Sequence, residues 1–130
     1  MDIITHDPVD GVYAATPDYA HAVELRGAER LLLASGTMGL DPAGAPGASL
    51  EEQLELVWAN LRAILAAAEM TVDDVVRVTS YLRDAEYAEA NARARVAALG
   101  GRSVPTTAVV VGTLSADWLV ELEILAAAGG

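Results

Sequence analysis

The sequence contains no cysteine, no lysine and no phenylalanine. Without cysteine the protein has neither a disulfide nor a thiol nucleophile, which is typical of cytosolic proteins. The missing lysine and phenylalanine accompany abundant alanine, and we interpret this as a compositional bias of the genome. No apolar run approaches the roughly 20 residues of a membrane-spanning helix, and the first residues lack the basic and then apolar layout of a secretory signal. We therefore expect a soluble, cytoplasmic protein that does not bind membranes.

Positive charge is also scarce. Eight arginines stand singly among 19 acidic residues, which gives a net charge of −11. Nucleic-acid backbones are bound by clusters of lysine and arginine, so we expect no nucleic-acid partner. The two histidines, His6 and His21, have no metal-ligand spacing to each other or to carboxylates. No phosphate-binding loop, dinucleotide fingerprint or Ser-His-Asp order is present, and we predict neither a metal nor an organic cofactor.

The apolar pattern predicts six strands. Side-chain alternation and β-branched runs place them at residues 3–4, 19–26, 31–35, 75–82, 106–113 and 118–126. Because only residues 27–30 separate the second and third strands, we expect these two to form a hairpin.

Two helices are predicted between the strands. A capping box at residues 49–52 begins a helix over 50–68, whose apolar side chains form one continuous stripe. Trp58 lies on that stripe, and we interpret it as a core side chain. Asp84 is expected to cap a second helix over 85–99. The inward face predicted for the second helix consists of Ala88, Ala92, Val96 and Leu99, with Asn91 and Arg95 beside it.

The element order β-β-β-α-β-α-β-β predicts an α+β fold, with a six-stranded mixed sheet and two helices on one face. The length suits a single domain over residues 1–130. Its core is expected at about residues 19–127, and residues 1–18 are expected to form an N-terminal extension.

The second face of the predicted sheet has no helix to cover it. The last strand turns Glu121 and Glu123 toward this face together with Leu119 and Leu125. Acids on an apolar strand cannot face a dry core unpaired, and exposed apolar residues mark interaction surfaces. We therefore expect an oligomer in which this face is buried between subunits, with any pocket at the seam.

A pocket at that seam needs polar groups from several elements. The candidates are Tyr19, Ser35, Asn91, Thr106 or Thr107, and Glu121. Each has an ordinary structural explanation as well, as a strand-edge aromatic, a solvated helix residue or an acid in a surface ion pair. The residues alone leave both interpretations open.

Taken together, several segments carry more information. They are Pro17-Asp18-Tyr19-Ala20-His21-Ala22-Val23, residues 34–42, residues 75–84, Pro105-Thr106-Thr107 and Val120-Glu121-Leu122-Glu123. This set resembles the motifs of the Rid family of reactive-intermediate deaminases, also called YjgF-like proteins, with Asp18 inserted into the family's Pro-Tyr pair. The resemblance covers about residues 19–127 and implies the chorismate-mutase-like α+β fold.

The resemblance also implies a function. Rid proteins are homotrimers with small-molecule clefts between subunits, and active members hydrolyse enamines and imines, such as 2-aminoacrylate, to ketoacids and ammonia. It implies catalytic roles for Glu121, which would orient or activate water, and for Tyr19. The substrate-binding residues that it implies are Ser35, Gly36, Asn91, Thr106 and Thr107.

Two departures from the family pattern limit this expectation. Thr107 stands where active members have the arginine that binds the substrate carboxylate, and Val109 replaces their usual Cys or Ser. A hydroxyl cannot replace a guanidinium fork, so we predict weak or absent 2-aminoacrylate hydrolysis. Three alternatives stay open: a hydrolase or tautomerase with an altered imine, enamine or carbonyl substrate, a non-catalytic trimeric metabolite-binding protein, and a ribonuclease, which the acidic charge disfavours. Whether Met38, His21 or Trp118 lines the cleft also stays open.

Overall fold

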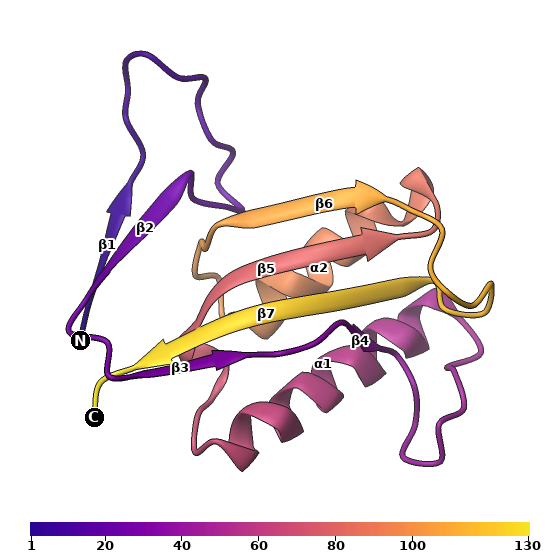
Figure 1. Ribbon diagram of the computed structural model, residues 1–130. Helices are drawn as coiled ribbons and strands as arrows, with labels where there is room; N and C mark the ends of the chain where they lie inside the picture. Colours follow the sequence, from indigo (N-terminus) through magenta and orange to yellow (C-terminus); the bar gives the residue numbers. More distant parts are fainter.

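A computed structural model describes all 130 residues, and its main feature is a five-stranded sheet with two helices on one face (Figure 1). The strands are β1 (Asp2–His6), β2 (Ala22–Arg26), β3 (Arg30–Leu33), β4 (Thr37–Met38), β5 (Val75–Leu82), β6 (Thr106–Val110) and β7 (Val120–Ala128). The helices are α1 (Leu50–Ala67) and α2 (Ala88–Ala98), with the 3-10 turns η1 (Val72–Asp74) and η2 (Ala85–Tyr87). In the sheet, β7 lies between β5 and the successive strands β3 and β4, and β6 forms the edge beyond β5. Only β5 and β6 run parallel.

The predicted fold class is confirmed, but the strands divide between two sheets. The predicted hairpin between the second and third strands is wrong, because β2 pairs with β1 in a separate two-stranded sheet and β3 pairs with β7. The chain turns away from β2 at Gly27, whose φ of 73° favours glycine. The short connection limits the distance between the two strands and does not specify which partner each of them takes.

The hydrophobic core fills the space between the sheet and the two helices. A cluster of 15 buried apolar residues lies there, and Leu61 and Leu65 of α1, Val78 of β5 and Leu122 of β7 are completely buried. The alternation predicted for β7 is confirmed, because Val120, Leu122 and Ile124 all belong to this core cluster.

Helix α1 begins where the sequence predicts. The Ser49 hydroxyl accepts a hydrogen bond from the Glu52 amide at 3.2 Å, while the Glu52 carboxylate accepts from the Ala48 amide rather than from Ser49. Apolar periodicity missed the buried Gln53, whose Nε2 donates to the carbonyls of Gly47 and Asp117 at 3.0 and 2.9 Å. This amide ties the start of α1 to the loop that leads into β7.

The inward face predicted for α2 is largely wrong. Of the four residues predicted, only Leu99 is buried, and Ala88 is exposed. The helix buries Asn91 and Arg95, which the sequence placed beside the predicted face. Because alanine side chains bury little apolar area, hydrophobic burial alone does not strongly favour one face of α2 over another. The ion pair between Arg95 and Asp18 therefore influences which face turns inward.

The second face of the five-stranded sheet carries no helix (Figure 1). Along β7 it presents Glu121, Glu123 and Leu125, which are half-buried, and along β3 it presents Leu31 and Leu33, which are 60% and 73% exposed. We call this surface the open sheet face. Neither α1 nor α2 combines the length and apolar character needed to cross a membrane.

Candidate functional site

The carboxylate of Glu121 lies directly above Gly36. Glu121 is the second residue of β7 and pairs with Met38 of β4, which brings the loop between β3 and β4 across the start of β7. A Cβ at position 36 would come within 2.0 Å of Glu121 Oε2. The loop therefore needs a glycine here for the carboxylate to occupy its observed position, and the neighbouring Ser35 is exposed.

Tyr81 and Glu123 form a hydrogen-bonded pair next to Glu121. Tyr81 of β5 faces Glu121 across the β5–β7 ladder, and its hydroxyl donates to Oε1 of Glu123. This hydrogen bond requires the neutral phenol, so it raises the pKa of Tyr81 above its usual value, and the charge of Glu121 adds to the effect. Glu123 is thus engaged, whereas Glu121 has no hydrogen-bond or ion-pair partner in the chain.

These residues surround a shallow depression of about 300 Å³ on the open sheet face. It is lined by Gly36, Tyr81, Glu121 and Glu123, together with residues 111–114 of the loop after β6. Strand alternation within β7 places Glu123 beside Glu121 on this face, whereas the closeness of Tyr81 to Glu121 follows only from the register between β5 and β7. That register is the information that the sequence analysis lacked.

The two candidate threonines face different environments. Thr106 donates its hydroxyl to the carbonyl of Val104 at 2.9 Å and is therefore engaged locally. Thr107 pairs with Thr79 of β5, and its Oγ1 accepts from Nη2 of Arg77 at 3.4 Å. Arg77 is exposed and has no ion-pair partner. Strand alternation in β5 places this guanidinium on the same face as Thr79, but nothing in the sequence singled it out as a site residue.

Tyr19 and Asn91 lie away from Glu121. Tyr19 lines a separate cavity of about 410 Å³ at the base of the loop between β1 and β2, where its ring packs edge-on against His21. Asn91 is buried on α2, on the helical side of the sheet, with no partner for its Oδ1. A single chain thus brings Ser35 and Gly36 to Glu121, but neither Tyr19 nor Asn91.

The loop that carries Tyr19 is held to α2 by Asp18. Nη2 of Arg95 lies 2.8 Å from Asp18 Oδ2, and Nη1 donates to the Asp18 carbonyl at 2.5 Å. The Thr16 hydroxyl donates to the other carboxylate oxygen. The hydrogen bond from Thr16, followed by that from Arg95, holds the pKa of Asp18 below its usual value. The residue inserted into the Pro-Tyr motif is therefore the one that anchors the loop.

The structure groups no three acidic or histidine side chains in a way that could hold a metal ion. The open sheet face presents one free carboxylate, a tyrosine paired with a second carboxylate, several hydroxyls and one guanidinium. Such a set can orient water and move protons.

The fold and this face together define an α+β protein of the YjgF type. Residues 12–128 match the sequence profile of the family described as Endoribonuclease L-PSP. The chain is 33% identical over 112 residues to the RutC family protein PH0854 of Pyrococcus horikoshii, which covers 83% of this chain and 85% of that relative. The chain therefore belongs to this family, which also contains the Rid proteins, and the resemblance found in the sequence is confirmed.

Other relatives agree with this assignment. The RutC family protein YjgH of Escherichia coli is 34% identical over 76 residues, which span 58% of this chain and 57% of that relative. The structure of the Rid-family protein YyfB of Yersinia pestis superposes with a TM-score of 0.83 at 26% identity and covers 98% of this chain and all of that one. RidA of a Psychrobacter species superposes with a TM-score of 0.72 at 28% identity, over 88% of this chain and 92% of its own.

Proposed function

We propose that the protein hydrolyses or tautomerises an imine, an enamine or a related small carbonyl metabolite, with Glu121 as the proton-transferring residue. The observation that carries the proposal is the Glu121 carboxylate, which lies over Gly36 without any partner in the chain. A carboxylate at the start of a strand, beside a depression and free of ion pairs, is suited to general base catalysis.

In the proposed reaction an enamine first tautomerises to an imine, as its carbon gains one proton and its nitrogen loses one. Glu121 then removes a proton from a water molecule, whose oxygen attacks the imine carbon to give a carbinolamine. The proton held by Glu121 passes to the nitrogen as the carbinolamine forms. Glu121 then takes the proton of the carbinolamine hydroxyl and passes it to the nitrogen, the carbon–nitrogen bond breaks as the carbonyl forms, and a carbonyl compound and ammonia leave. One water is consumed, and the carboxylate returns to its starting state.

We further propose that copies of the same chain cover the open sheet face, in a homotrimer with the small molecule bound between subunits. Two observations support this. Leu31 and Leu33 are largely exposed beside Glu123 and Leu125, and an exposed apolar surface marks an interaction site. Tyr19 lines a separate cavity away from Glu121, so a shared site would draw it from a neighbouring copy, whereas Asn91 is buried inside its own chain.

The substrate is proposed to differ from 2-aminoacrylate. Thr107 offers a neutral hydroxyl where active relatives are expected to have an arginine. The guanidinium of Arg77, which lies on β5, donates to the same hydroxyl. It therefore does not occupy the position that an arginine side chain at residue 107 of β6 would take. We infer that a neutral or cationic imine fits this acidic face better than a small amino-acid-derived carboxylate.

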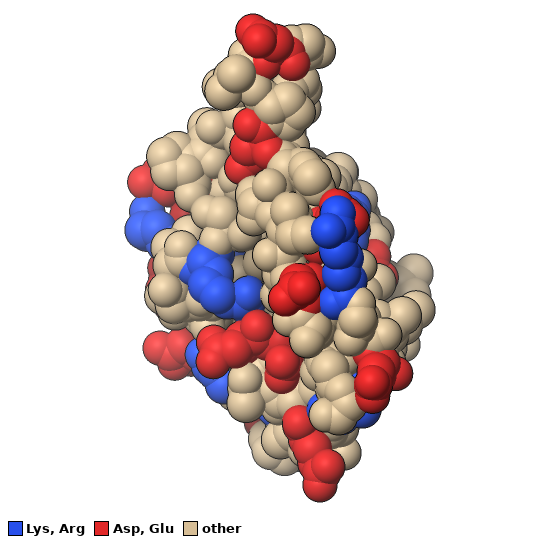
Figure 2. Space-filling model, turned by 90° about the vertical axis from the view of Figure 1, so that its left-hand side faces the viewer, with Lys and Arg blue, Asp and Glu red and all other residues tan.

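The absence of an arginine at position 107 also favours a second candidate, a non-catalytic protein that binds a small metabolite in the same cleft. The ribonuclease implied by the family's description has less support, because arginines and acids are interspersed on the side of the molecule shown in Figure 2 without a continuous basic surface. A cytoplasmic location stays a prediction from the sequence.

One experiment separates the enzyme from the binding protein. Ammonia release is measured from a panel of neutral, cationic and anionic imines with the wild type, with Glu121→Gln and with Glu86→Gln, an exposed control in η2. The proposal predicts turnover of at least one neutral or cationic imine, its loss in Glu121→Gln, and no change in Glu86→Gln. Equal activity of Glu121→Gln and wild type would refute the proposed role. Binding of a panel member that survives in Glu121→Gln, without turnover by either protein, would support the non-catalytic alternative.

A further inference from the structure

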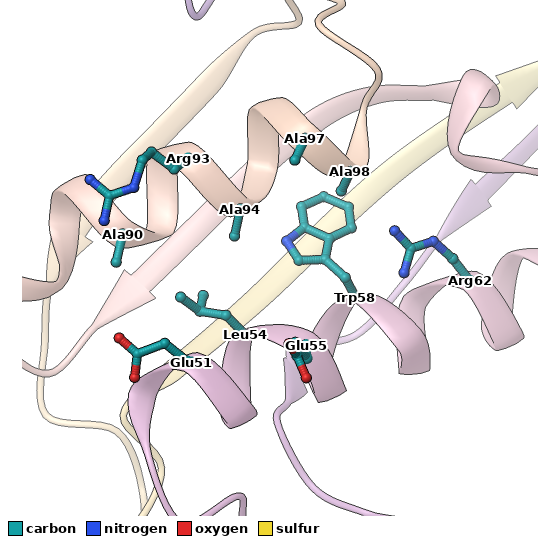
Figure 3. A pocket seen from close by; sticks show the side chains of 10 residues that line it. All are labelled: Glu51, Leu54, Glu55, Trp58, Arg62, Ala90, Arg93, Ala94, Ala97 and Ala98. Atoms are coloured by element: carbon teal, nitrogen blue, oxygen red, sulfur yellow. The ribbon is translucent and has the colours of Figure 1, made fainter.

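A groove of about 440 Å³ lies between α1 and α2, away from the open sheet face (Figure 3). Its lining is apolar between the helices, and this apolar floor is formed by Leu54 and Trp58 of α1 and by Ala90, Ala94 and Ala98 of α2, with the exposed Ala97 at its margin. Alanine side chains on α2 leave open the space that larger residues would fill. Clefts of 300–1,000 Å³ are the usual size for small-molecule sites.

Trp58 gives this groove a polar group that the fold does not use. The sequence analysis interpreted Trp58 as a core residue, and the structure confirms that it is 3% exposed. Its Nε1 is buried without any hydrogen-bond partner. Buried donors without a partner are rare in native proteins. In Figure 3 the indole nitrogen lies on the side of the ring toward Leu54 and Ala94, so the N–H faces along the groove.

Charges of both signs stand around the apolar floor. Glu51, Glu55, Arg62 and Arg93 line the groove, and Arg93 is paired with Glu89 at 2.8 Å. The four lining charges cancel, and Glu89 adds one negative charge at the rim, so the groove disfavours an anion. A neutral molecule on the apolar floor buries only apolar surface and leaves the charged side chains of the rim hydrated.

We propose that this groove binds a small, neutral, planar apolar molecule that carries one hydrogen-bond acceptor, such as an aryl ketone, and that Trp58 Nε1 donates to that acceptor. The acceptor reaches Nε1 by parting Leu54 from Ala94. Helix residues line the groove, and Figure 1 shows both helices on one side of the sheet, whereas Glu121 lines the depression on the open sheet face. The result for this site is therefore independent of the proposed reaction. The groove also stays accessible when other copies cover the open sheet face.

The test uses the full chain and three probes of similar size: acetophenone with a carbonyl acceptor, ethylbenzene without one, and the anion benzoate. The second tryptophan, Trp118, is replaced by phenylalanine so that the remaining indole N–H resonance in a ¹H–¹⁵N spectrum belongs to Trp58. Acetophenone is expected to shift this resonance downfield. Ethylbenzene is expected to bind without that shift, because it has no acceptor.

Two further variants test the residues. Trp58→Phe keeps an aromatic floor and removes the N–H, and it should lower the acetophenone-to-ethylbenzene affinity ratio about 2- to 12-fold, the contribution of one neutral hydrogen bond. Ala97→Leu fills the groove from an exposed position and should abolish binding of both probes, whereas Ala88→Leu, exposed on α2 outside the groove, should not.

Failure of acetophenone to move the Trp58 resonance at millimolar concentration would overturn the proposal, as would binding that Ala97→Leu leaves intact. Both results are available even if Trp58→Phe does not fold. Stronger binding of benzoate than of acetophenone would overturn the assignment to a neutral ligand and indicate that Arg62 dominates the site.

Discussion

We predict that removing Asp18 lowers the free energy of unfolding more than removing its ion-pair partner Arg95. The Arg95 side chain is 5% exposed and that of Asp18 is 38% exposed. Removing one partner of a fully buried pair costs about 3–5 kcal/mol, because the remaining charge stays buried. In Asp18→Ala the stranded group is the buried guanidinium. It keeps its hydrogen bond to the carbonyl of residue 18, and exposure of the lost carboxylate lowers the cost further, so we expect a loss of about 2–3 kcal/mol.

The opposite variant, Arg95→Met, leaves Asp18 without its ion-pair partner, but the Asp18 carboxylate is accessible to water. Asp18 becomes hydrated, and the methionine fills most of the volume of the arginine stem. We expect a loss of only about 1 kcal/mol. The assay is urea unfolding at a fixed protein concentration, because association would add to the apparent stability. Equal losses, or a larger loss in Arg95→Met, would refute the reasoning from burial.

The same pair has a pH signature. The pKa of Asp18 is lower in the folded protein than in the unfolded chain, where it is 3.8. Its stabilising contribution is therefore complete above the unfolded value and is lost as the pH falls from there through the lowered folded value. The free energy of unfolding of the wild type should consequently fall toward that of Asp18→Asn over this acidic range. A difference between the two proteins that does not change from pH 6 to pH 2.5 would contradict this assignment.

Three other variants test the open sheet face. Gly36→Ala should displace the flexible end of Glu121, since a Cβ would lie 2.0 Å from Oε2. We expect imine turnover to be lost while the free energy of unfolding falls by less than about 1 kcal/mol. Unchanged turnover would contradict the position of Glu121 over Gly36. Thr107→Arg should raise pyruvate release from 2-aminoacrylate by about 10-fold or more, because a charged hydrogen bond contributes about 1.5–3 kcal/mol; no increase would refute the account of position 107. Glu123→Gln should lower the raised pKa of Tyr81 toward 10.0, so that in a spectroscopic titration this phenol ionises earlier than in the wild type. The hydrogen bond of the neutral Tyr81 phenol stabilises the fold below pH 10.0, and this contribution is lost as the pH rises through the raised pKa of the folded protein. A titration that is unchanged in Glu123→Gln would show that Glu123 does not cause the raised pKa.

The elements that the sequence predicted well are those with strong periodicity. The capping box and apolar stripe specified α1, and alternation placed Glu121 and Glu123 on the face away from the helices. Local patterns of this kind depend on residues a few positions apart. They gave the fold class and, with the motifs, the family.

The features that the sequence missed depend on contacts between distant segments. Gln53 is polar, and its burial depends on the carbonyl of Asp117, 64 residues away. The orientation of α2 involves Arg95 meeting Asp18 across 77 residues. Tyr81 joins Glu121 only through the strand register. Apolar periodicity contains none of these pairings, because each requires the folded arrangement of the sheet.

The central claim is that copies of this chain cover the open sheet face and enclose Glu121 between them. The most direct test is the molar mass in solution, measured by sedimentation equilibrium on the wild type. The chain has a mass of 13.5 kDa, and we predict a single species of three times that mass, which Leu33→Glu should dissociate. A wild-type protein that sediments as a 13.5 kDa monomer at micromolar concentration would contradict the claim and leave Glu121 open to solvent.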